Sequence, residues 1–278
     1  MSTIPIWAFL AATILVVLLA IEAGYRLGRA AHRHAEVEKV PPVSSMAGAI
    51  LGLLAFMLAF TFGMVATRYD SRKALVRDES SAIRAAWLRS DLLPESDRGA
   101  AAGLLKEYVD LRLRAVQSRD LDQVYTALGE STRIQRQLWA MAAANARSNM
   151  NSPVAALYVE SLNEVIRLQA VRVAVGLQAR IPSGIWMVLY SLIALAMLAV
   201  GFHTAIAGSR RSWAAPILAL SFSIVLTLIT SLDRPLSDFV TVSQQPLVDL
   251  RASMDTGLQV PSGQGSQRRL GAATEVGQ

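Results

Sequence analysis

The chain has 278 residues, of which 53% are hydrophobic and only 17% are charged, whereas soluble domains carry about 25% charged residues. Its formal net charge is +6 and it has no cysteine, which excludes disulfides, cysteine-ligated zinc and thiol catalysis. We assign the positive charge to anchoring beside anionic lipid headgroups. Nucleic acid is not an expected partner, because no dense Lys/Arg block or nucleic-acid motif is present. The composition favours an integral membrane protein, whose first partner is the lipid bilayer.

The first uncharged run is Ile4–Ile21, IPIWAFLAATILVVLLAI. No Lys or Arg precedes it, and the positive residues follow it, so we expect a retained membrane span rather than a secretory signal peptide. Glu22 and Arg26 follow at a spacing of four residues, which predicts an ion pair on the helix near the interface. The alternative is a functional carboxylate inside the membrane, which would be costly.

The second uncharged run, Val43–Ala66, is followed by a charged segment. About 20 apolar residues cross a bilayer as a helix, so this run is long enough to span. From Arg68 onward, no Pro or Gly interrupts the chain until Pro94. The sequence therefore predicts one long helix that leaves the membrane and continues into water.

This second span has two distinctive strips. Small residues recur at helical spacing and predict a helix-packing surface in lipid; they are Gly48, Gly52, Ala55 and Ala59. Phe56 and Phe60 lie four residues apart on a neighbouring strip. They are either ordinary lipid-facing or packing residues, or a hydrophobic constriction of a pore that gates by dewetting.

Residues 95–180 show helical periodicity without any alternating segment, and they predict a water-soluble helical insert. Turn signals at Ser118–Asp120 and Asn149–Pro153 divide it into helices, with Ser152 as an expected N-cap before Pro153. The expected fold is an all-α membrane protein with four transmembrane helices and a helical-bundle insert between helices 2 and 3. The expected domains are a first transmembrane pair (1–66), the insert (67–182), a second pair (183–232), a juxtamembrane amphipathic segment (233–255) and a disordered tail (256–278).

The third and fourth spans are Ile185–Ala207 and Ala214–Leu232. The fourth carries hydroxyl side chains on one face, namely Ser223, Thr227, Thr230 and Ser231. In a channel, such a face would line water. Alternatively, these hydroxyls bond to carbonyls of their own helix or to a neighbouring helix. Both readings remain open at the level of sequence.

No phosphate-binding loop, dinucleotide fingerprint, zinc-protease motif or nucleophile elbow is present. With three histidines and no cysteine, we expect no metal, no cofactor and no catalytic residue. Charged residues of both signs flank the spans and predict an ion-paired juxtamembrane collar rather than an acid/base pair. They are Arg68, Asp70, Arg72, Asp78, Glu79, Asp233 and Arg234. An enzyme is therefore the least expected class.

Several separated segments resemble the bacterial bestrophin-like membrane proteins. They are the run LLAFMLAFTFGMVATRYDSRKALVRDESSAIRAAWLRSDLLP, then EYVDLRL (Glu107–Leu113), SPVAALYVESLNEVI, and the closing DRP with VSQQPLVDLRASM. The resemblance covers roughly Val43–Met254. It implies a multi-pass protein of the bacterial inner membrane.

Bestrophins are pentameric anion channels with a helical insert and a pore lined by the second span. The resemblance therefore implies a homo-oligomeric anion channel, with Phe56 and Phe60 at positions like the pore neck. The sequence departs from the animal channels because it has no acidic calcium-binding cluster. The alternative is a non-conducting sensor or scaffold whose insert binds a ligand or partner. A transporter ranks lower, since no inverted pair of Gly/Pro-broken spans is present.

The two short connections between consecutive spans must face the same side of the membrane. They carry six basic residues, Arg26, Arg29, Arg33, Lys39, Arg210 and Arg211, while none precedes the first span. The positive-inside rule then places both connections in the cytoplasm and the insert on the outer side. Basic residues also flank the spans on the insert's side, and the insert of bestrophins is cytoplasmic. We expect the outer-side orientation.

Overall fold

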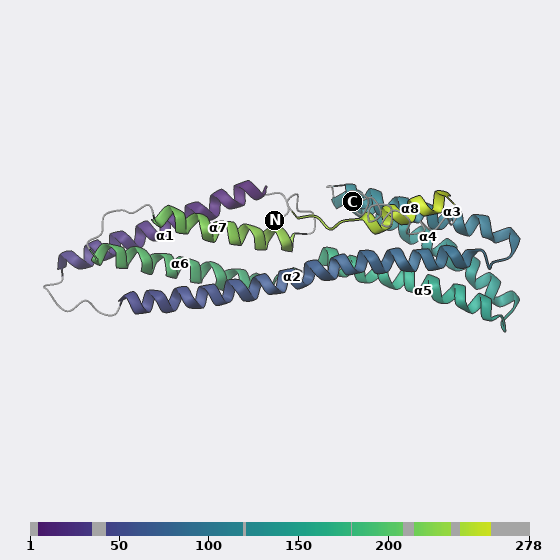
Figure 1. Ribbon diagram of the computed structural model, residues 1–278, viewed down its shortest axis with the longest axis horizontal. Coiled ribbons are helices and arrows are strands. Elements are labelled where there is room, and N and C mark those ends of the chain that lie inside the picture. The colour runs from purple at the N-terminus through teal and green to yellow at the C-terminus, as the bar shows by residue number, and fades with distance from the viewer. Residues whose placement is uncertain are drawn as a thin grey trace, which may run out of the picture. The chain divides into compact units, whose positions relative to one another are not determined.

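A computed structural model of the chain describes residues 5–34, 43–118, 121–178, 180–207, 214–234 and 240–256. Its elements are α1 (Ile6–His34), α2 (Val43–Ser90), α3 (Glu95–Gln117), α4 (Leu121–Ser148), α5 (Pro153–Val173), α6 (Ser183–Ile206), α7 (Ala214–Asp233) and α8 (Gln245–Thr256), with a π-helical turn at Ala174–Gln178 (Figure 1). The described residues contain no strand. Four helices are long and apolar enough to cross a membrane, namely α1, α2, α6 and α7. The predicted all-α class with four spans is confirmed.

The chain divides into two compact units, which we describe separately. The membrane unit comprises residues 1–72 and 174–242, and the insert unit comprises 73–173 and 243–278. Helix α8, from the predicted juxtamembrane segment, belongs to the insert unit and packs against α3. The predicted tail lies, from residue 257 onward, outside the described residues.

Helix α2 is continuous for 48 residues, from Val43 to Ser90, as the absence of Pro and Gly after Arg68 predicted. Its uncharged part and the first charged residues, through Arg72, belong to the membrane unit, and the charged part from Lys73 onward belongs to the insert unit. Helix α1 is longer than the sequence indicated. It continues through Arg26 to His34, because residues 29–34 contain no Pro or Gly and include two alanines, which favour helix.

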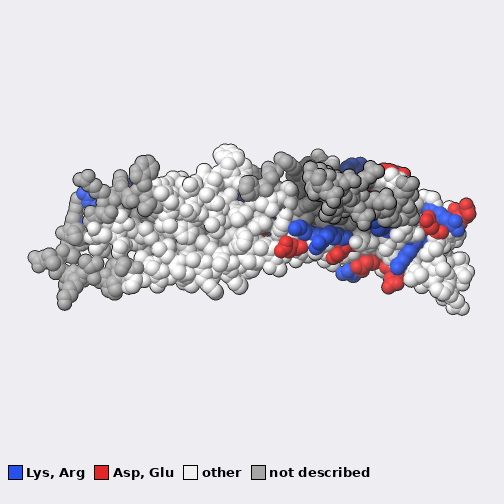
Figure 2. Space-filling model, viewed as in Figure 1, with Lys and Arg blue, Asp and Glu red and all other residues white. Residues whose placement is uncertain are grey.

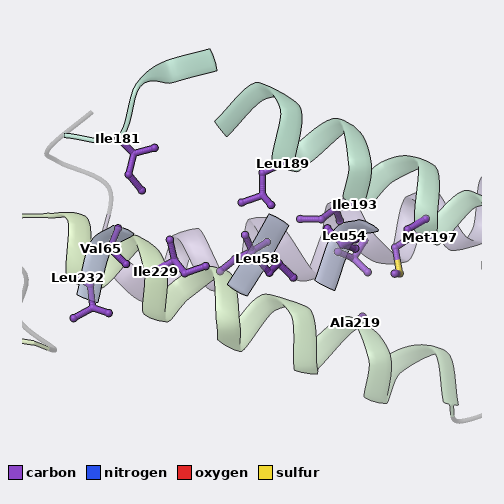
Figure 3. Close-up of a cluster of buried hydrophobic side chains, with 13 residues drawn as sticks. Leu54, Leu58, Val65, Ile181, Leu189, Ile193, Met197, Ala219, Ile229 and Leu232 are labelled. Carbon is purple, nitrogen blue, oxygen red and sulfur yellow. The ribbon is translucent and has the colours of Figure 1, made fainter. Parts of the chain in front are cut away.

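The core of the membrane unit is apolar. Leu54, Leu58 and Val65 of α2 lie among side chains of α6 and α7, including Ile193 and Ile229 (Figure 3). All five are buried, and Val17 of α1 joins them. This arrangement fixes which side of α2 faces its own protomer and leaves the opposite side outward.

Helices α1 and α6 approach each other backbone to backbone. A Cβ built on Gly24 would lie 2.0 Å from the carbonyl oxygen of Leu198, and one built on Gly201 would lie 2.0 Å from that of Ile21. Gly28 faces Phe202 in the same way, at 2.7 Å. Only glycine fits at these places, since the atoms that a side chain would meet are backbone and cannot move away without separating the helices.

The insert unit is a bundle of α3, α4, α5, α8 and the second half of α2. Its largest fully buried side chains include Tyr108, Leu138 and Tyr158. The backbone N–H of Ala155 donates to Ser152 Oγ at 3.2 Å, so the predicted N-cap of α5 is confirmed. In Figure 2, charged side chains gather over the insert unit, and the visible face of the membrane unit is almost uncharged.

Candidate functional site

The outward side of α2 in the membrane unit carries both phenylalanines that the sequence singled out. Phe56 is 66% exposed and Phe60 is 56% exposed, whereas Leu54 and Leu58 on the opposite side are buried. The two rings therefore point away from the helices of their own protomer.

The small residues of α2 lie on the same outward side. Gly48, Gly52, Ala55 and Ala59 are all exposed, and a Cβ added at either glycine would meet nothing within 4 Å. This open strip contrasts with the occupied glycines of α1 and α6. We call the strip and the two phenylalanines together the outward face of α2.

The hydroxyls of α7 lie elsewhere. Ser223, Thr230 and Ser231 are buried within the membrane unit. Thr227 donates to the Ser223 carbonyl at 2.6 Å and Thr230 donates to the Leu226 carbonyl at 2.8 Å. Two of the four hydroxyls thus bond to their own helix, as one of the two sequence interpretations described. Ser223 Oγ is fully buried without a hydrogen-bond partner.

A polar cluster closes the end of α7 in the membrane unit. Arg72, which is buried, donates from Nη1 to the Leu232 carbonyl at 2.9 Å and from Nη2 to the Asp233 carbonyl at 3.3 Å. The Asp233 carboxylate accepts from the Ile181 N–H at 3.0 Å and from Arg68 at 3.4 Å. We call these residues the Asp233 cluster. It satisfies carbonyls at a helix C-terminus, which otherwise lack partners.

A second polar cluster lies inside the insert unit. Glu79 of α2 is completely buried and pairs with Arg112 of α3 and Arg172 of α5. Arg112 Nε lies 2.9 Å from Glu79 Oε1, and Arg172 contacts Oε2 through Nη1. Tyr108 donates to Oε1 at 3.1 Å. Arg172 also donates to Gln244, just before α8, at 2.6 Å.

Gln135 of α4 completes this set by donating to the Tyr108 hydroxyl at 3.5 Å. The Glu79 cluster, as we call these six residues, thus draws on α2, α3, α4, α5 and the residue before α8. Each of the six side chains contacts a residue of another element, although Arg112 Nε makes no hydrogen bond despite its short distance to Glu79. The cluster therefore fixes how the helices of the insert unit pack, in addition to their apolar contacts.

Burial and charge act against each other within the Glu79 cluster. Burial raises the pKa of Glu79, but the guanidinium groups of Arg112 and Arg172 outweigh it and hold this pKa below its usual value. Burial, together with the nearby Glu79 carboxylate, raises the pKa of Tyr108. The pKa of Arg112 is raised, because Glu79 outweighs burial. That of Arg172 is lowered, because burial outweighs Glu79. The cluster therefore favours the charge on Arg112 more than the charge on Arg172.

The other predicted collar residues are scattered. Asp70 and Asp78 are exposed on α2, and the guanidinium carbon of Arg234 lies 5.8 Å from the centre of the Phe9 ring. The structure brings Arg68, Arg72 and Asp233 together in the membrane unit and buries Glu79 in the insert unit. Within the part of the chain that the structure describes, no group of three or more His, Cys, Asp or Glu residues is arranged to hold a metal ion.

Five of the six residues of the Glu79 cluster were absent from the residues predicted from sequence, namely Tyr108, Arg112, Gln135, Arg172 and Gln244. For Arg112 a signal was present, since it continues the apolar stripe of Leu105, Tyr108 and Ala115. A charged residue in a core position must find a buried partner. The glycines of α1 and α6 were also missed, although Gly24 and Gly28 form a G-x-x-x-G pattern.

Comparison with known families gives one match. The family described as "Bestrophin-like domain" matches residues 8–247, which include α1 from its third residue onward and the whole of α2 to α7. No curated protein and no solved structure matches the chain. The match extends over far more than half of the chain and contains both polar clusters and the outward face of α2. The chain belongs to the bestrophin-like family.

Proposed function

We propose that the protein is a homo-oligomeric anion channel in which α2 lines the pore and Phe56 and Phe60 form its constriction. Family membership supports this assignment, because bestrophins are anion channels. The observation that carries it is the outward face of α2. Two large aromatic side chains stand exposed there, beside small residues with open space above them. Such a strip lets helices of other copies approach closely in lipid.

Cross-linking tests the assembly, because the chain has no native cysteine. Gly52→Cys places a single thiol on the outward face, and oxidation in the membrane is expected to join neighbouring copies. Val65→Cys is the matched control, since Val65 lies on α2 but is fully buried in its own protomer. Equal cross-linking of both variants, or no cross-linking of either, would contradict the proposal that this face contacts neighbouring copies. Particle images then give the copy number, for which the bestrophins suggest five.

Ion flux tests conduction directly. Purified protein in liposomes should pass chloride, and Phe56→Ala with Phe60→Ala should raise the leak by widening a hydrophobic constriction. Ile217→Ala on α7 is the control, because Ile217 is also 64% exposed in the membrane unit. Tight vesicles containing verified oligomers would contradict the channel. Unchanged flux in the double variant of a conducting protein would place the constriction elsewhere.

A non-conducting sensor or scaffold is the second candidate, and one observation favours it. A shallow, mainly apolar groove runs between α3 and α4 of the insert unit, lined by Gly99, Gly103, Leu104 and Met141 among others. A ligand or partner segment fits such a surface better than a flat helix face does. A monomer or dimer in mild detergent, with no flux, would favour this function over the channel.

We further propose that the protein resides in the bacterial inner membrane with its insert on the outer side. The six basic residues of the two short connections support this orientation through the positive-inside rule. Alkaline phosphatase fused after Gly129 is then expected to be active. Fluorescent protein at the same site is expected to stay dark. Strong fluorescence without phosphatase activity would establish a cytoplasmic insert.

A further inference from the structure

The chain enters or leaves the insert unit at three places, after Arg72, after Val173 and after Val242. The Glu79 cluster contains one residue close to each place. Glu79 lies on α2, Arg172 is the last but one residue of α5, and Gln244 directly precedes α8. Arg172 holds the other two, through Nη1 to Glu79 and through Nη2 to Gln244. One side chain therefore ties together all three chain segments that continue into the membrane unit.

The two arginines of the cluster are not equivalent. Arg112 lies close to both carboxylate oxygens, with Nε 2.9 Å from Oε1 as an ion-pair contact and Nη2 donating to Oε2 at 3.4 Å, and Tyr108 donates a second hydrogen bond. Glu79 therefore keeps partners if Arg172 leaves. Arg172 is the more exposed of the two, with 12% of its side chain accessible against 6% for Arg112. Its departure would leave no buried carboxylate unpaired, which is the costly outcome in clusters of this kind.

The helix changes its geometry directly after Arg172. Residues Ala174–Gln178 form a π-helical turn that includes Gly176. Such turns are rare, contain one residue more than an α-helical turn, and occur frequently at functional sites. Conversion of the turn to α-helix shifts the register by one residue, which rotates one side of the helix by roughly 100° relative to the other. A rotation of that size would carry a side chain at position 172 away from Glu79.

We propose that Arg172 of α5 acts as a latch that holds α5 to α2. In the closed state, described above, Arg172 holds Glu79 and Gln244 together. In the open state the π-helical turn becomes α-helical, Arg172 turns toward solvent, and Glu79 stays with Arg112. The contacts of Arg172 with Glu79 and Gln244 lie within the insert unit, and the π-helical turn that follows is the first segment of the membrane unit after α5. Any effect of the latch on ion flux rests on the proposed function, in which α2 lines the pore.

Hydrogen exchange of the full chain in nanodiscs tests the latch without any measurement of conduction. In Arg172→Gln, amides of 174–178 and 245–250 should exchange about tenfold faster, because the contact that holds both segments is gone. Amides of α3 and α4 should keep their rates. Arg112→Gln is the matched variant, and it should accelerate exchange throughout the insert unit, since it removes the partner that Glu79 needs.

Two results would overturn the latch. One is an Arg172→Gln profile that spreads over α3 and α4 like that of Arg112→Gln, which would make Arg172 a structural tie. The other is no change at 174–178 and 245–250. If Arg172→Gln folds poorly, Gln244→Ala removes only the neutral contact and should accelerate 245–250 alone. Chloride flux measured in parallel distinguishes the latch from the proposed channel. A wild-type protein without flux would contradict the channel, and the exchange result would still test the latch.

Discussion

The membrane unit and the insert unit are both helical, yet they pack by different means. In the membrane unit, α1 and α6 meet at glycines whose Cβ positions are filled by the backbone of the other helix. In the insert unit, a carboxylate and two guanidinium groups are buried together between helices. Lipid provides no hydrophobic drive for helix association, so close backbone packing takes over that role. In water, apolar burial drives association and a buried polar cluster fixes the packing.

The comparison also separates two kinds of glycine within the membrane unit. Gly24 and Gly201 are required by contacts inside one protomer, whereas Gly48 and Gly52 face open space. The first kind allows α1 and α6 to approach closely. The second kind lies on the face that the proposed function assigns to assembly between copies.

Gly201→Leu should have the largest effect. Its Cβ would lie 2.0 Å from the Ile21 carbonyl oxygen, and neither backbone can yield without separating α1 from α6. We expect loss of the folded protein, seen as loss of the monodisperse peak in size-exclusion chromatography. Gly52→Leu is the control, because its side chain meets nothing within the protomer; it should keep the protomer folded and lower the oligomer. Wild-type elution of Gly201→Leu would show that the close approach is not needed.

Glu79→Gln should have the next largest effect, in the insert unit. It leaves two buried guanidinium groups without a carboxylate, and breaking a buried pair in this way costs about 3 kcal/mol or more. We expect a clear fall in Tm, which thermal unfolding monitored by circular dichroism would measure. Glu164→Gln makes the same chemical change at an exposed pair with Arg167, and it should leave Tm unchanged within error. Equal shifts for both variants would contradict a special role for the Glu79 cluster.

Much of the fold could be predicted because its signals are local. Uncharged runs mark the four spans, and the helices α3, α4 and α5 begin at Glu95, Leu121 and Pro153, where turn residues end. The continuation of α2 into the insert unit follows from the absence of Pro and Gly between Arg68 and Ser90. None of these predictions needed to know which helices are neighbours.

The polar clusters could not be predicted in the same way, because they depend on which faces meet. Asp78 and Glu79 are adjacent acids, and only the helical phase decides that Glu79 joins the buried side with Val76 and Ile83 while Asp78 faces solvent. The apolar stripe of α2 indicates that phase. It does not indicate which residues of α3 and α5 become the partners of Glu79. The outward face of α2 poses the same problem on a larger scale, since no helix of the described residues packs over the small residues and phenylalanines that form it.

A third prediction concerns the Asp233 cluster of the membrane unit. Arg72→Met keeps an apolar stem but removes two charged hydrogen bonds from the end of α7, each of which is worth roughly 1.5 kcal/mol. We expect a lower Tm and faster proteolysis after α7. Arg68→Met should be milder, because Arg68 is more exposed and makes one contact of 3.4 Å. The reverse order would show that the carboxylate contact, rather than the capping of α7, stabilises this region.

The smallest expected effect is the part of the pH dependence of stability that Glu79 of the insert unit contributes. Two guanidinium groups hold the pKa of Glu79 below its ordinary value of 4.5. The unfolded chain therefore binds the proton first as pH falls, so the stability that this carboxylate contributes is complete above pH 4.5 and is lost below it. We would measure Tm of the wild type and of Glu79→Gln from about pH 7 to about pH 3. The difference between them should stay constant down to pH 4.5 and then shrink, because other carboxylates titrate equally in both proteins. A difference that shrinks already at neutral pH would mean that Glu79 is protonated in the folded protein, and that the two arginines do not outweigh its burial.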